Sequence, residues 1–251
     1  MNITKKVRKI TLGILGTAIL ASGLWACNND EVSGDSQLNN ARSNISVASK
    51  SVKIAPDEVG YLHNQCILLT EKYFEENNIN VKNLTIKEYL GNMLIVAKEN
   101  YPQHFADVKE SDLQSFFADY TNYGDYTIEH HFENKLKAYI SPSTTNNSFI
   151  KFAEEKFSFD YSYSDLVMNF QRFEEENANE FTSEEIYRNE VFKSVLHNSN
   201  TLWSTKTKPK DPTIDMLFTD TLTAAITAGL GPLGVLAGGA ASAITYYRIT
   251  Q

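Results

Sequence analysis

Hydrophobic positions beyond residue 56 recur at every third or fourth residue, which is the spacing of one face of an α-helix. A stripe of this kind points into a core, so the sequence predicts a helix that begins near Pro56. Cys66 lies within the stripe and is expected to be a small buried hydrophobe. The stripe consists of Val59, Leu62, Cys66, Leu69 and Tyr73.

Two later helices are marked by a motif at their N-termini. Thr85 and Thr182 are each followed three residues later by a glutamate, Glu88 and Glu185. In such a capping box the threonine side chain accepts a hydrogen bond from the glutamate amide, and the glutamate carboxylate accepts one from the threonine amide. The sequence therefore predicts helices that begin after Thr85 and after Thr182, and Pro102 ends the first of them.

The same periodicity predicts further short helices separated by polar segments. One starts near Ser111, and the others cover residues 127–139, 149–155 and 165–176. Short helices with short connections are typical of an all-α fold. We therefore expect an irregular bundle of six or seven short helices, followed by a C-terminal Gly/Ala-rich hydrophobic helix or helical hairpin.

One stretch departs from the helical pattern. Phe157 to Tyr163 alternates aromatic and polar residues, which is the period of a half-buried strand. Two interpretations stay open. The aromatic side chains either form a platform on which sugar rings stack, or belong to an extended connector and fill the bundle.

The N-terminus has the organisation of an export signal. Residues 1–9 are basic and carry no acidic residue, and residues 10–24 are apolar over about the length of a signal core. The next residues, Leu24-Trp25-Ala26-Cys27, resemble the lipobox of bacterial lipoproteins, in which a small residue precedes an invariant cysteine. The resemblance implies cleavage before Cys27, attachment of diacylglycerol to its side chain and acylation of the new N-terminus.

The residue after this cysteine bears on the location. An aspartate directly after the lipobox cysteine resembles a signal for retention in the inner membrane. This chain has Asn28 at that position instead. The resemblance therefore implies a lipid-anchored protein of the cell envelope of a Gram-negative bacterium, on the outer membrane. Two or three acyl chains hold a protein durably at a bilayer, because each buried CH₂ contributes about 0.8 kcal/mol.

Changes in composition divide the chain into five segments. A signal peptide covers residues 1–26, and residues 27–55, rich in Asn, Ser and Asp, form a tether. The helical domain covers residues 56–205, and a lysine- and proline-containing linker covers residues 206–213. Residues 214–251 form the Gly/Ala-rich hydrophobic segment.

The C-terminal segment is uncharged from Thr221 to Tyr247, long enough for a helix to cross a hydrocarbon layer of ~30 Å. Its glycines, threonines and proline oppose membrane insertion. One interpretation is a hairpin that turns at residues 229–232 and packs on the bundle or on a second copy. Another is a membrane helix in which small residues allow close helix contact. A third is a membrane-active peptide, loosely similar to glycine-rich helices of small bacteriocins. The small residues spaced by four are Gly234 and Gly238, and Ala237 and Ala241.

Charge and residue chemistry exclude several functions. The net charge is −8 although the first nine residues are basic, and an acidic protein repels phosphate backbones, so no nucleic-acid partner is predicted. His63 and Cys66 lack the further ligands that zinc needs, and His130 and His131 are neighbours that point apart on a helix. We predict no metal, no cofactor and an exposed histidine pair; Glu174 to Glu176 are expected on a solvated face.

The sequence favours a lipid-anchored envelope protein that acts as a non-catalytic interaction or structural module. Its Gly/Ala-rich tail is expected to pack in a membrane or an oligomer interface, so the predicted partners are the membrane and a second copy. Because no Gly-rich phosphate loop or Gly-x-Ser-x-Gly motif occurs, no catalytic residue is assigned. Two alternatives remain: a membrane-perturbing antagonism factor with the tail as effector, and a hydrolase with an unrecognised site.

Cys27→Ala is expected to abolish labelling of the protein by a radioactive fatty acid, because it removes the acceptor thiol and the cleavage signal. Cys66→Ala is the matched control and should leave the label in place, since this second cysteine is predicted to be buried. Label that persists in Cys27→Ala would contradict the lipoprotein assignment.

Overall fold

The computed structural model describes residues 53–139, 148–156, 161–206 and 213–250. All of these belong to one unit of the chain, which begins at Gln37. The predicted signal peptide, the lipobox with Cys27 and most of the tether lie outside the described residues.

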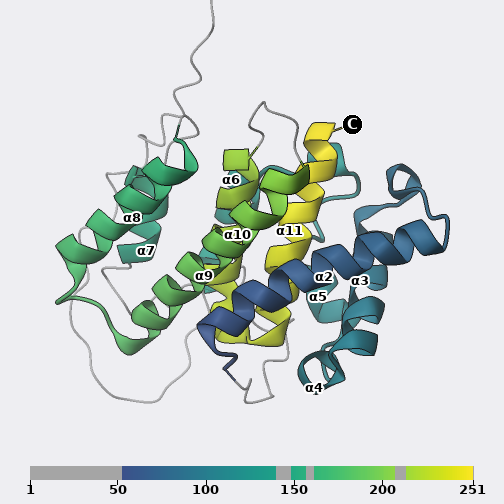
Figure 1. The fold of residues 1–251 in the computed structure, drawn as a ribbon, viewed down its shortest axis with the longest axis horizontal. Coiled ribbons are helices and arrows are strands. Elements are labelled where there is room, and N and C mark those ends of the chain that lie inside the picture. Colours follow the sequence, from purple (N-terminus) through teal and green to yellow (C-terminus); the bar gives the residue numbers. More distant parts are fainter. Residues whose placement is uncertain (1–52, 140–147, 157–160, 207–212, 251) are drawn as a thin grey trace, which may run out of the picture. The chain divides into compact units, whose positions relative to one another are not determined.

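Every regular element of the described residues is helical (Figure 1), which confirms the predicted all-α bundle with a C-terminal helical hairpin. Several elements are single turns, and η4 is a π-helical turn. The elements are α2 (Pro56–Glu76), η1 (Val81–Asn83), α3 (Ile86–Asn100), α4 (Pro102–Phe105), α5 (Glu110–Phe116), η2 (Tyr123–Asp125), α6 (Ile128–Asn134), η3 (Leu136–Tyr139), α7 (Ser148–Lys151), η4 (Phe152–Lys156), α8 (Tyr163–Asn177), α9 (Ser183–Lys206), α10 (Thr213–Thr227), η5 (Ala228–Leu230) and α11 (Pro232–Thr250).

Both predicted capping boxes are present. The Glu88 amide donates to the Thr85 hydroxyl oxygen over 3.2 Å, and the Thr85 amide donates to the Glu88 carboxylate over 2.7 Å. Thr182 and Glu185 form the same pair of bonds, at 3.2 and 2.8 Å. These local bonds satisfy amides that the first turn of a helix leaves unpaired, so the sequence alone was enough to place both helix starts.

Two predicted boundaries were wrong. The helix expected over residues 127–139 stops at Asn134, because the backbone of Lys135 (φ −125°, ψ −54°) leaves the helical region before η3 begins. The aromatic and polar alternation ends where α8 begins, since Tyr163 is the first residue of that helix. The Ser162 hydroxyl caps it, and residues 157–160 lie outside the described residues.

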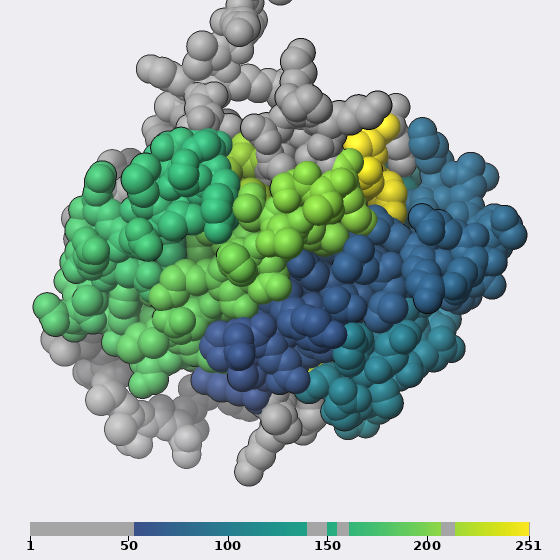
Figure 2. Space-filling model, viewed as in Figure 1, coloured from purple at the N-terminus to yellow at the C-terminus, as the bar shows by residue number. Residues whose placement is uncertain are grey.

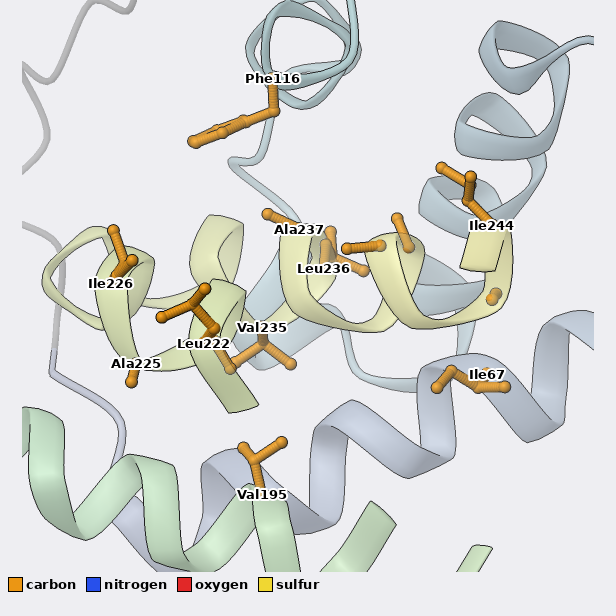
Figure 3. Packing of buried hydrophobic residues seen from close by; sticks show 14 of the residues in the cluster. Ile67, Phe116, Val195, Leu222, Ala225, Ile226, Val235, Leu236, Ala237 and Ile244 are labelled. Atoms are coloured by element: carbon orange, nitrogen blue, oxygen red, sulfur yellow. The ribbon is translucent and has the colours of Figure 1, made fainter. Parts of the chain in front are cut away.

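The C-terminal segment forms a hairpin, as the first of the three interpretations predicts. Helices α10 and α11 are joined by η5 and Gly231, whose φ of 57° and ψ of −128° suit only a residue without a Cβ. Figure 3 shows Leu222 and Val235 of the two helices between them, with Val195 of α9 and Ile67 of α2 pointing toward the hairpin. Among the described residues, none of the helices combines the length and the apolar character that a membrane span requires.

The predicted small residues contact other parts of the same chain. A Cβ on Gly234 would lie 2.8 Å from the carbonyl carbon of Thr227 and closer still to its oxygen. A Cβ on Gly238 would lie 3.0 Å from the Ala224 Cβ. Both glycines therefore face α10 and let the two helices approach closely. The other two small residues, Ala237 and Ala241, are fully buried in the core.

Helices α2, α3 and α9 form a shell around this hairpin. Helix α9 contacts α2 and α10, and α2 also contacts α11 and α3. In the view of Figure 2, α2 and α9 cover most of the hairpin, and the C-terminal end of α11 is visible beyond them. The hairpin is thus the centre of the core.

Gly234→Ala is expected to lower the free energy of unfolding by about 1–3 kcal/mol, because its Cβ would strike a backbone carbonyl that cannot move without separating α10 from α11. Gly124→Ala is the matched control: a Cβ there meets no atom within 4 Å. Urea unfolding of both variants measures the difference. Equal midpoints would show that the close approach of the two helices contributes little.

Candidate functional site

A groove with a volume of about 550 Å³ lies between the first turns of α3 and helix α5. Ile86, Leu90, Phe117 and Tyr120 form its floor, because these lining residues are each 6% exposed or less. Polar and small side chains form its rim. The rim residues are Thr85, Lys87, Ser111, Gln114, Ser115, Ala118 and Thr121.

Local hydrogen bonds hold the two sides of this groove. The Ile86 amide donates to the Thr121 carbonyl over 3.3 Å, which joins the start of α3 to the segment after α5. On α5, the Ser115 hydroxyl donates to the Asp112 carbonyl over 2.6 Å. The groove is therefore built from a capped helix start and a short helix that lies against it.

The lining of the groove contains one charged residue, Lys87, which is exposed and forms no ion pair with the described residues. The nearby Glu88 carboxylate is bound by the backbone and side chain of Thr85, and these bonds lower the pKa of Glu88. The Tyr120 hydroxyl is buried without a hydrogen-bond partner among the described residues. Burial raises the pKa of Tyr120, and the charge of Asp119 raises it further.

His131 lies on the far side of the groove floor. Its ring stacks on Phe117, with ring centres 5.0 Å apart and an angle of 11° between the planes. The expectation of an exposed histidine pair was wrong for this residue, which is fully buried, whereas its neighbour His130 is exposed. Burial lowers the pKa of His131 to about 3, with smaller contributions from Lys135 and His130, so the ring is a neutral part of the core.

A cluster of buried polar residues joins the four central helices. Asp220 of α10 accepts a hydrogen bond from the Trp203 indole of α9 over 3.0 Å. Burial raises the pKa of Asp220, although His63 of α2 and the Ser199 and Ser242 hydroxyls favour its charged form. All five residues have no exposed surface. A serine, a histidine and an aspartate thus lie together where solvent has no access. This position suits a role in fixing how the core helices pack better than a role in hydrolysis.

Arg188 is another buried polar residue whose role the sequence did not indicate. It is nearly buried on α9 and donates to the carbonyl oxygens of Ala225 and Ile226, in the last turn of α10. A cation at this position satisfies free carbonyls and complements the helix dipole. Glu184 binds the same guanidinium over 2.6 Å, and this bond lowers the pKa of Glu184.

The remaining predicted residues take the following positions. Cys66 is buried as predicted, and burial raises the pKa of its thiol to about 12. Among the described residues, no three His, Cys, Asp or Glu side chains are grouped so that they could hold a metal ion. Glu174 of the acidic run pairs with Lys193 over 3.1 Å. Cys27 lies outside the described residues.

Comparisons of this chain with protein-family models, with curated proteins and with solved structures found no match. Its function is therefore inferred from the residues themselves. The groove is an open feature of the described residues that combines apolar and polar groups, and the polar core cluster and Arg188 hold the hairpin in place.

Stability is expected to fall as the pH falls from 6.5 toward 3. The pKa of His131 is 6.5 in an unfolded chain and about 3 in the fold. Between these values the unfolded chain binds a proton that the folded chain does not, which costs up to about 1.4 kcal/mol per pH unit. His131→Phe keeps a ring beside Phe117 without titrating, so its free energy of unfolding should depend less on pH.

Urea unfolding at pH 7, 5.5 and 4.5 measures this dependence. His197→Gln is the matched control, because His197 is exposed on α9 and its removal should leave the slope of the wild-type chain. A His131→Phe variant with the wild-type slope would show that other groups cause the loss of stability in acid.

Proposed function

We propose that this protein is a lipid-anchored protein of the Gram-negative cell envelope, on the outer membrane, whose helical unit is a non-catalytic binding module. The lipobox-like sequence that ends at Cys27 supports the anchor. Two or three acyl chains suffice for durable attachment, so the anchor needs no contribution from the C-terminus.

The observation that carries this proposal is the burial of the C-terminal hairpin. In α11 every residue from Leu233 to Thr245 is buried. The hairpin supplies the core on which α2 and α9 pack, and a core element is unavailable as a second anchor while the unit is folded. That the tail packs in a membrane or an oligomer interface stays a prediction, and such packing would require the hairpin to leave the core.

The groove supports the binding role. It combines an apolar floor with a polar rim, and its volume lies in the usual range of ligand sites. The lining residues supply hydroxyl, amide and ammonium groups but no carboxylate, imidazole or thiol. Such groups orient a bound molecule, whereas acid–base catalysis relies mostly on the groups that the lining lacks.

Cys27→Ala, in a chain whose residues 1–26 are replaced by a cleavable secretory signal without a lipobox, is expected to move the protein from the membrane fraction into the soluble fraction after alkaline carbonate extraction, because the signal is removed and the hairpin remains in the core. Cys66→Ala is the control and should stay with the membrane. Recovery of Cys27→Ala in the membrane fraction would contradict the proposal, since it would mean that another segment holds the protein in the bilayer.

The enclosed hairpin also favours a second candidate, a membrane-perturbing antagonism factor with the tail as effector. Amphipathic helices that cover an apolar hairpin in water would release it at a membrane. The full chain added to dye-filled vesicles of phosphatidylethanolamine and phosphatidylglycerol distinguishes the two candidates. Dye release favours the effector, and vesicles that stay sealed contradict it.

A further inference from the structure

The floor of the groove sets the first requirement for a ligand. Ile86, Leu90, Phe117 and Tyr120 present aliphatic and aromatic surface, and they lie at the bottom of a groove that remains open at its rim. Apolar surface gains free energy when it leaves water, so the bound molecule needs an apolar part that covers this floor.

The charges around the groove set the second requirement. The chain carries a net charge of −8, yet Lys87 is the only charged residue of the lining. Four acidic residues adjoin the lining in sequence, and each has a partner. Glu88 accepts hydrogen bonds from Thr85, Glu110 accepts one from Gln114 over 2.5 Å, Asp112 accepts one from Ser111 over 3.5 Å, and Asp119 pairs with Lys135 over 3.1 Å. A single unpaired ammonium group at the rim complements one negative charge.

The polar rim sets the third requirement. Thr85, Ser111 and Thr121 supply hydroxyl groups to the rim along with Lys87, whereas the hydroxyl of Tyr120 is closed to solvent. A carboxylate has several acceptor positions and accepts readily from both a hydroxyl and an ammonium group.

We propose that this groove binds a small amphipathic monocarboxylate, with its apolar part on the floor and its carboxylate toward Lys87. The inference rests on the proposed binding function and names the class of ligand. A phosphate ester carries more charge than one lysine complements, and a fully hydroxylated sugar would leave the apolar floor uncovered.

The test uses octanoate and octan-1-ol, which share a chain length and differ in charge. Isothermal titration calorimetry on the full chain with Cys27→Ala is expected to show octanoate binding about fivefold more tightly than the alcohol, as one partly exposed ion pair allows. Lys87→Met should remove this preference, and Lys87→Arg should retain it.

Two further variants make the result specific to the groove. Ala118→Trp places a large side chain at an exposed position of the rim and should abolish binding of both compounds. Lys82→Met removes an exposed lysine of η1, outside the lining, and should change nothing. Thermal unfolding of each variant checks that its fold is retained.

Three outcomes would overturn the proposal: no octanoate binding, equal binding of octanoate and octan-1-ol, or binding that survives Ala118→Trp. Any of these, together with a soluble Cys27→Ala protein after carbonate extraction, rejects the ligand class and leaves the anchored module intact. Octanoate binding to a Cys27→Ala protein that remains in the membrane fraction would reject the anchor and keep the groove.

Discussion

The close approach of α10 and α11 is the contact on which the rest of the structure depends. At Gly234 and Gly238 no α11 side chain separates the helices, so Thr227 and Ala224 lie directly against the α11 backbone. This distance also brings Asp220 into a cluster with residues of three other helices. A wider hairpin would open the cluster to water and separate the faces on which the shell helices pack.

The composition that weakens this segment as a membrane span suits it as a protein core. Most of its threonine hydroxyls, Thr223 excepted, are satisfied within their own helix, as Thr221 and Thr245 show by donating to the carbonyls of Leu217 and Ala241 over 2.7 and 2.8 Å. Buried hydroxyls bonded in this way avoid the cost of an unpaired polar group. Arg188 donates to carbonyl oxygens at the end of α10, where the helix itself offers no further amide to bond them.

The sequence predicted features that depend on neighbouring residues and missed those that depend on which helices meet. The capping boxes at Thr85 and Thr182 use bonds between residues three apart, so the glutamate that follows each threonine was enough to predict them. The burial of His131 follows from the position of Phe117 behind the groove, which no local pattern encodes. Asp220 gave a usable signal, because it is one of only two acids in the largely apolar helix α10, but its partners come from α2, α9 and α11. The groove depends on the packing of α3 against α5 and has no sequence motif of its own.

The position of the hairpin along the chain has a consequence for biogenesis. Every helix of the shell precedes the hairpin in sequence, so during synthesis the amphipathic faces of α2, α3 and α9 emerge before the surface that buries them exists. Domains generally fold as units once their parts are present. The shell is therefore expected to stay unfolded until α11 has been made, which would suit the export that the proposed lipid anchor requires.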